Sequence, residues 1–215
     1  MRPHYFSHKQ IVLITALIFL ILSFVFFRES EFQGHPNLSG QPTLGSSNAP
    51  VEVIAFEDPL CSLCIHYSTD IFPMLRKNYI DTGKVRYSLI LVSFIEGSLP
   101  NAQALMCMQY QNPSLFFSYM DNFFKVAENS NGPRSQIWKE TALEMPGIDV
   151  SVLSHCVNND TYVSNLQKNL EMGQKIMGDE FGTPILIINK TVVPGTSYET
   201  IVKTIDKALE TTQKK

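Results

Sequence analysis

Cys61-Ser62-Leu63-Cys64 is a Cys-x-x-Cys motif in a chain of 215 residues. An apolar run, Val51 to Phe56, comes just before it, and apolar residues at helical spacing follow it as far as Tyr79. A strand that leads directly into a helix places both cysteines at the helix N-terminus. Unpaired N–H groups and the helix dipole at such an end favour a thiolate over a thiol. The motif therefore predicts a cysteine pair that exchanges disulfides.

The two cysteines are expected to have different roles. Exchange begins when a thiolate attacks a disulfide sulfur, and Cys61 stands at the first helical turn. We therefore expect Cys61 to react with substrates and Cys64, one turn deeper, to resolve the mixed disulfide. Ser62 is a candidate hydrogen-bond donor to the thiolate. Glu57 and Asp58, just upstream, would oppose ionisation by like charge.

The two remaining cysteines, Cys107 and Cys156, fall in a helical part of the chain. They are too far apart in the sequence to complete a four-cysteine zinc site with the first pair, so no metal site is expected. In an oxidising compartment they are expected to form a second disulfide, with two buried free thiols as the alternative.

The N-terminal part of the chain has the features of an export segment. Residues 11–27 form an uncharged, mostly apolar run that would span about 26 Å as a helix, enough for a bilayer core. Arg2 and Lys9 precede this run, so the positive-inside rule leaves the N-terminus in the cytoplasm. We expect residues 1–28 to form a transmembrane signal anchor, since no cleavage pattern follows; a cleaved signal peptide is the alternative. Residues 29–50, rich in Gln, Gly, Pro, Asn and Ser, are expected to form a flexible linker.

The rest of the chain, residues 51–212, is expected to form one α/β domain. The first strand, a helix and a second strand make a right-handed βαβ unit. Helical periodicity interrupted by prolines then predicts an all-helical insertion over about residues 98–181. A hairpin and a last helix complete the domain. These later elements are the strand Val85 to Val92, the hairpin strands Pro184 to Asn189 and Thr191 to Val193, and a helix from Thr196.

This order of elements resembles the DsbA-like thiol:disulfide oxidoreductases, whose fold is a thioredoxin fold (βαβ…ββα) with an inserted helical domain. The resemblance implies that fold here, and it implies a cis peptide bond between Thr183 and Pro184 that exposes backbone to a substrate beside Cys61. Its local matches are Asn48-Ala49-Pro50-Val51 leading through Phe56 and Asp58 to the cysteine pair, Gly182-Thr183-Pro184 as the cis-proline loop, and Asn189 with Gly195 in the following hairpin.

Some features of the motif depart from that family. Ala55 occupies the position six residues before the first cysteine, where the family often has an acid that helps to move the resolving thiol's proton. Ser62-Leu63 also lacks the histidine of the most oxidising members. Asp58 and His66 are further candidates for tuning the thiols. We expect a potential inside the window of roughly −270 to −120 mV, away from its oxidising end.

The resemblance implies a membrane-tethered bacterial enzyme in the periplasm or extracytoplasmic space, anchored in the inner membrane. It would pass its Cys61–Cys64 disulfide to cysteines of exported proteins, need no cofactor besides that disulfide, and be reoxidised by a DsbB-like membrane quinone reductase. A reductase or isomerase kept reduced by a membrane donor is one alternative, and a thioredoxin-fold metallochaperone is another. A net charge of −3 and a pI near 5.9 make nucleic acid an unexpected partner.

Overall fold

The computed structural model describes residues 34–213 of the chain. The predicted membrane span, residues 11–27, and the rest of the predicted anchor lie outside these residues. Within the described part, no helix is long and apolar enough to cross a membrane.

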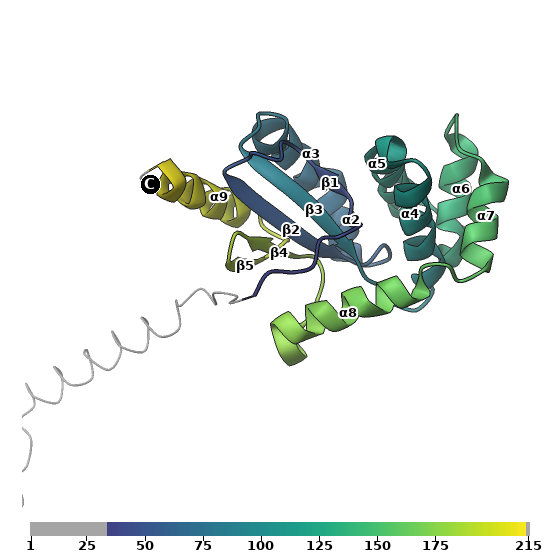
Figure 1. Ribbon diagram of the computed structural model, residues 1–215. Helices are drawn as coiled ribbons and strands as arrows, with labels where there is room; N and C mark the ends of the chain where they lie inside the picture. Colours follow the sequence, from purple (N-terminus) through teal and green to yellow (C-terminus); the bar gives the residue numbers. More distant parts are fainter. Residues whose placement is uncertain (1–33, 214–215) are drawn as a thin grey trace, which may run out of the picture. The chain divides into compact units, whose positions relative to one another are not determined.

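A mixed β-sheet of five strands forms the centre of the described residues (Figure 1). Its central strands, β2 (Val51–Glu57) and β3 (Val85–Leu91), are parallel, mostly apolar and almost continuously buried, as strands covered on both faces are. On the other side of β2 lies β4 (Ile185–Ile188), which is antiparallel to β2, followed by β5 (Thr191–Pro194) at the edge. The predicted strands and hairpin are therefore confirmed.

The connection between β2 and β3 is one continuous helical segment, so the predicted βαβ unit is also confirmed. It runs through α2 (Ser62–His66), η1 (Tyr67–Ile71), α3 (Phe72–Leu75) and η2 (Arg76–Ile80). The η1 and η2 segments are π-helical, and η1 turns Tyr67 and Ser68 toward the interior. Pro73 stands near the start of α3, directly after the π-helical segment η1, and it removes one N–H donor from the helical hydrogen bonds there.

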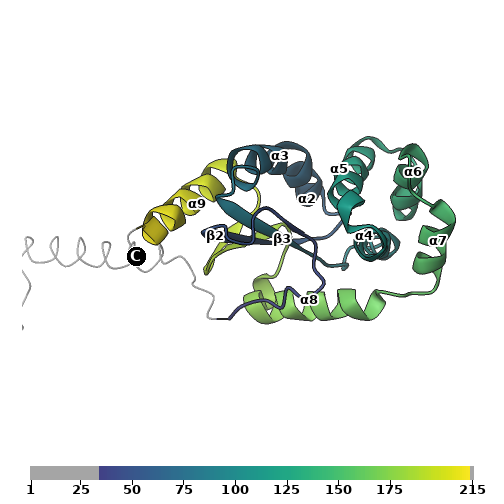
Figure 2. The ribbon, with the colours of Figure 1, turned by 45° about the horizontal axis from the view of Figure 1, so that its top comes forward.

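The predicted helical insertion is confirmed as a bundle beside the sheet. Figure 2 shows that α2, α3 and the last helix, α9 (Tyr198–Gln213), cover one face of the sheet, while α8 runs along the opposite face. The Cys107–Cys156 disulfide joins α4 to α7, as expected. The insertion comprises α4 (Leu99–Gln111), α5 (Pro113–Asn129), η3 (Arg134–Gln136), α6 (Ile137–Glu144), α7 (Val150–Asn158), α8 (Val163–Met177) and η4 (Gly178–Glu180).

The prediction of a flexible linker is wrong for the part of residues 29–50 that the structure describes. Pro36 and Pro42 are buried, and β1 (Thr43–Leu44) pairs with the outer edge of β3. The Gln41 amide also donates a hydrogen bond of 2.8 Å to Asn169 Oδ1 on α8. The pairing with β1 provides hydrogen-bond partners for backbone groups on the outer edge of β3, so the folded domain begins well before Val51.

The side chains of β2 alternate between two apolar clusters on the two faces of the sheet. Val51, Val53 and Ala55 face the cluster that includes the helices after the motif, whereas Ile54 and Phe56 face the side of α8. Because successive side chains on a strand point to opposite faces, Glu57 continues the Ala55 face.

Candidate active site

The cysteine pair and the Thr183-Pro184 loop meet at one end of the strands, where β2 finishes and β4 begins. Cys61 follows the end of β2 as the N-cap of α2, and Phe56 on β2 pairs with Ile185 at the start of β4. The Thr183–Pro184 peptide bond is cis, as the resemblance implied. The Cys61 thiol is half-buried and donates a hydrogen bond of 3.1 Å to the Thr183 carbonyl oxygen, and Cys64 is buried. Both cysteines are free thiols.

The surroundings of Cys61 stabilise its thiolate. They lower its pKa from the ordinary value of 9.0 to about 5. The largest cause is a hydrogen bond with the Cys64 side chain, which outweighs the opposing cost of partial burial. Further contributions come from Thr183 and from the backbone N–H groups of Leu63 and Cys64. These last two are free donors of the first helical turn, which is the effect that the motif predicted.

Cys64 has the opposite preference. Burial raises the pKa of its thiol far above the ordinary value, and the nearby charges of Glu57 and Cys61 raise it further. The Thr183 hydroxyl is buried and makes no direct hydrogen bond, so it is free to interact with a thiolate at either sulfur. The site therefore holds one thiolate, on Cys61, beside a protonated Cys64.

A buried acid near the pair was missed as a functional group by the sequence analysis. Glu57 is fully buried, and its carboxyl accepts hydrogen bonds from the hydroxyls of Ser68 at 2.8 Å and Tyr87 at 2.9 Å. Burial is the main cause that raises its pKa from 4.5 to about 7. Glu57 lies on the same face of β2 as Ala55, two residues further along. Side chains two residues apart on a strand share a face. This periodicity could have identified Glu57 as a replacement for the acid that the family often has at the position of Ala55.

Asp58 holds the loop that leads into the motif. Its buried carboxylate accepts hydrogen bonds from the backbone N–H groups of Leu60, Phe94 and Ile95 and from the Ser98 hydroxyl, at 2.9 to 3.1 Å. The Leu60 carbonyl in turn accepts a 2.8 Å hydrogen bond from the Arg134 side chain of the helical insertion. The Asp58 carboxylate therefore stabilises this loop. Repulsion between Asp58 and the Cys61 thiolate, which the sequence analysis expected, is not among the causes that shift the Cys61 pKa.

The fold and site can now be compared with known proteins. The family model described as Thioredoxin matches residues 37–207. The chain belongs to the thioredoxin family. Its relatives include disulfide bond formation protein D of Bacillus subtilis, which is 29% identical over 82% of this chain and 81% of that protein.

Two solved structures extend this comparison of the thioredoxin-family fold. Oxidised BdbD from Bacillus subtilis has a TM-score of 0.73 and 28% identity over 84% of this chain and 99% of its own. DsbA from Chlamydia trachomatis has a TM-score of 0.70 and 27% identity over 81% of this chain and 95% of its own. The predicted membership in the DsbA-like group, and with it the class of thiol:disulfide oxidoreductases, is confirmed.

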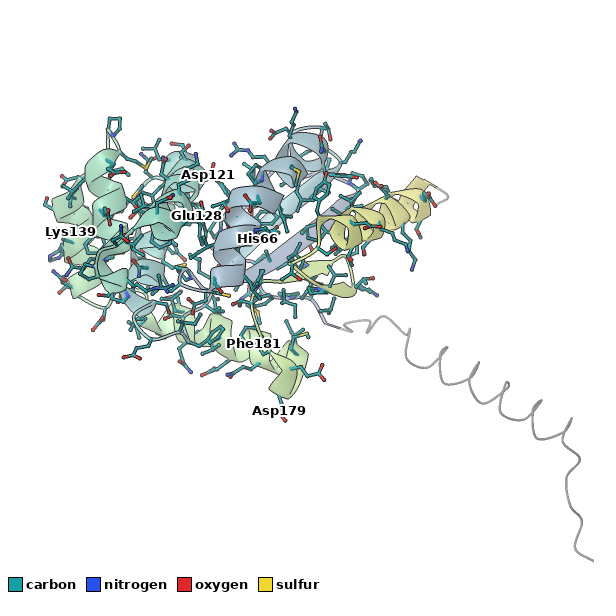
Figure 3. The ribbon with its side chains drawn as sticks, turned by 180° about the vertical axis from the view of Figure 1, so that it is seen from behind. His66, Asp121, Glu128, Lys139, Asp179 and Phe181 are labelled. Atoms are coloured by element: carbon teal, nitrogen blue, oxygen red, sulfur yellow. A yellow bond between two sulfur atoms is a disulfide. The ribbon has the colours of Figure 1, made fainter. Side chains whose placement is uncertain are left out.

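Three further residues of this thioredoxin-family site, Ser62, Leu63 and His66, were candidates for shifting the pKa values of the thiols. Their side chains make no hydrogen bond to either sulfur. Ser62 is exposed and is not among the groups that shift the Cys61 pKa. His66 pairs with Asp70 at 2.6 Å on an exposed helical surface, where Figure 3 labels it. The Leu63 side chain is 49% exposed, so it contributes an apolar surface next to Cys61.

Proposed function

We propose that this protein is an extracytoplasmic thiol:disulfide oxidase that passes its Cys61–Cys64 disulfide to cysteines of exported proteins. The observation that carries the proposal is the low pKa of Cys61, about 5. A stabilised thiolate favours the reduced form of the enzyme, so the oxidised form gives its disulfide away readily. This pKa lies between the values of about 7 for thioredoxin and about 3.5 for DsbA. It supports a potential inside the window of roughly −270 to −120 mV, measurable by equilibration with glutathione.

In the first step of the proposed reaction, a substrate thiolate attacks the Cys61 sulfur of the oxidised enzyme. A bond forms between the substrate sulfur and Cys61, the Cys61–Cys64 bond breaks, and its electron pair goes to Cys64. Because burial strongly favours the neutral form of Cys64, this sulfur must take up a proton. Glu57, with a pKa of about 7, can supply it near neutral pH.

In the second step, another substrate thiolate attacks the substrate sulfur of the mixed disulfide. The new substrate disulfide forms and Cys61 leaves as a thiolate, which is its stable form. Counted from its two thiols, the substrate has then lost two electrons and two protons. The enzyme holds both electrons, as the Cys61 thiolate and the Cys64 thiol. One of the two protons replaces the one that Glu57 gave to Cys64, and the other goes to solvent. The redox-active disulfide serves as the only redox group, with no separate cofactor.

The proposal includes a membrane tether and a membrane partner. The apolar run of residues 11–27 supports an N-terminal anchor in the inner membrane. The dithiol must be reoxidised, and a DsbB-like membrane quinone reductase is the proposed partner. Fractionation of the full chain and of a chain without residues 1–28 tests the tether.

Two alternatives use the same cysteines. A reductase or isomerase would keep the pair reduced in the cell, so the in vivo redox state of Cys61 and Cys64 distinguishes it from the oxidase. A metallochaperone would need further ligands, and the described residues contain no group of three or more His, Cys, Asp or Glu side chains that could hold a metal.

Trapping with a Cys64→Ala variant is the experiment that tests the oxidase. This variant retains the reactive Cys61 but cannot resolve a mixed disulfide, so exported proteins should accumulate as covalent adducts. A Cys61→Ala variant is the matched control and should form none. Absence of adducts, together with failure of the oxidised enzyme to oxidise a reduced unfolded protein, would rule the proposal out.

A further inference from the structure

An open pocket of about 460 Å³ lies between α8 and the segments that follow β3 and precede β4, and it has no part in the reaction described above. Phe94 follows the end of β3, and Phe181 comes just before Thr183-Pro184. Because β2 and β3 are parallel, Phe94 and Cys61 leave the sheet at the same edge. The pocket therefore lies at the end of the sheet where Cys61 stands, on the face that α8 covers. Its lining residues are Phe94, Leu170, Gln174, Gly178, Asp179 and Phe181.

The aromatic wall of this pocket is held in place by packing. The Phe181 ring meets the rings of Phe56 and Phe94 edge to face, with centroids 6.1 and 5.9 Å away. On its remaining side it packs against Gly173 of α8, where a Cβ atom would collide with the ring. Phe94 is nevertheless 47% exposed, so a large apolar ring faces solvent beside the redox site. The two rings therefore form an apolar wall that packing supports and that is open to solvent at Phe94.

The pocket also has an unpaired acid. Asp179 is exposed in η4, just after the end of α8, and lines the pocket together with Phe181; Figure 3 labels both residues. Among the residues that the structure describes, Asp179 has neither an ion pair nor a hydrogen-bond partner. Aromatic rings next to an unpaired carboxylate are complementary to a cation on an apolar stem. A purely apolar group in the pocket would remove the Asp179 carboxylate from water without providing a hydrogen-bond or ion-pair partner, and this desolvation costs free energy.

From this geometry we infer that the pocket binds an arginine or lysine side chain of the substrate, close to the cysteine that is being oxidised. The inference rests on the proposed function and adds a substrate preference to it. The stem of the basic residue lies against Phe94 and Phe181, and its charged end reaches Asp179. Phe181 is two residues from Thr183, and an extended chain advances about 3.3 Å per residue. The basic residue therefore lies within about three positions of the substrate cysteine.

The inference is tested with the oxidised full chain and a set of short dithiol peptides. The peptides differ only in one residue, Arg, Leu or Glu, placed in turn at each of the three positions on either side of the first cysteine. We expect kcat/KM to be about fivefold to tenfold higher for Arg than for Glu at the best position, with Leu between them. Asp179→Asn should remove most of the preference for Arg over Leu. Glu180→Gln, at the neighbouring acid outside the pocket lining, is the matched control and should keep it.

The rate at which dithiothreitol reduces each oxidised variant is the reference, and the kcat/KM of each peptide is compared with that rate. Equal kcat/KM for all peptides, or a preference for Leu that Asp179→Asn leaves intact, would overturn the inference while leaving the oxidase proposal standing. Failure to oxidise any peptide would instead count against the oxidase. Phe94→Ala gives a second test, because it should lower kcat/KM for the Arg peptide more than for the Glu peptide.

Discussion

The Cys61 sulfur lies 3.1 Å from the carbonyl oxygen of Thr183, a residue 122 positions further along the chain. A thiol can donate to this carbonyl, but a thiolate has no proton to give. Ionisation of Cys61 therefore exchanges this bond for donors nearby, which are first the Cys64 thiol and then the Thr183 hydroxyl and the first-turn N–H groups. The cis-proline loop and the motif thus form one site that changes its hydrogen bonds with the charge of the sulfur.

Thr183→Val removes the hydroxyl while keeping the shape of the side chain. We expect the Cys61 pKa to rise from about 5 by about one unit, because one donor to the thiolate is lost. Thiolate absorbance of the reduced protein against pH measures the shift, with the oxidised protein as the blank. An unchanged pKa would show that the hydroxyl does not interact with the thiolate.

Glu57→Gln removes the buried acid near Cys64. If Glu57 exchanges the proton of the resolving thiol, reduction of the enzyme by a dithiol substrate should slow by about tenfold to a hundredfold at neutral pH. The inflection of the rate near pH 7 should also disappear. Glu52→Gln, at the other end of β2 where Glu52 pairs with His35, is the matched control and should leave both features intact.

The same Glu57→Gln variant should change how stability depends on pH. The folded pKa of Glu57 is raised from 4.5 to about 7, so the folded state binds this proton more tightly than the unfolded state. Its contribution is therefore fully present below pH 4.5 and is lost as the pH rises through about 7. Relative to Glu57→Gln, the wild type should lose about 3 kcal/mol of unfolding free energy across that interval. Denaturant unfolding of the reduced proteins at several pH values measures the difference, and parallel curves would contradict it.

The strands of the sheet and the position of the cysteine pair could be predicted from the sequence, because each depends on residues that are close together in the chain. Apolar runs marked β2 and β3, and the Cys-x-x-Cys spacing marked the first turn of α2. Glu57 was missed as a buried acid because it was interpreted only as a like charge just upstream of the thiolate. The buried Glu57 carboxyl accepts hydrogen bonds from the hydroxyls of Ser68 and Tyr87. These residues are distant from Glu57 in the sequence, and only folding places them next to it.

The ordered segment before Val51 could not be predicted for a similar reason. Its Gly, Pro, Ser and Asn residues have the composition of a linker, and nothing local shows that Thr43 and Leu44 complete the edge of β3. The aromatic wall of the pocket is also a long-range feature. Phe94 and Phe181 come from opposite ends of the helical insertion, and they meet because that insertion begins and ends at one edge of the sheet.

Replacement of both cysteines of the second disulfide, by Cys107→Ala with Cys156→Ala, tests its contribution to stability. The bridge closes a loop of 49 residues, so its loss should cost about 4 kcal/mol of unfolding free energy in the chain-entropy account. Exchange at Cys61 should continue at temperatures where the variant is folded, since the bridge joins α4 to α7 away from the motif. A loss close to zero in denaturant titrations would mean that native packing of these helices carries the stability without the bridge.

Gly173→Ala tests whether the aromatic wall is held by α8. In the interior of a helix, glycine to alanine normally stabilises by up to about 1 kcal/mol. Here the added Cβ would collide with the Phe181 ring, which is already packed between Phe56 and Phe94, so we expect destabilisation by about 1 to 3 kcal/mol instead. The sign of the change in denaturant unfolding is therefore the decisive measurement. Displacement of Phe181 should also weaken the preference for the Arg peptide, whereas Lys175→Ala, an exposed change on the same helix, should alter neither quantity. A Gly173→Ala variant that is more stable than the wild type would show that the ring moves aside freely and that α8 does not fix the wall of the pocket.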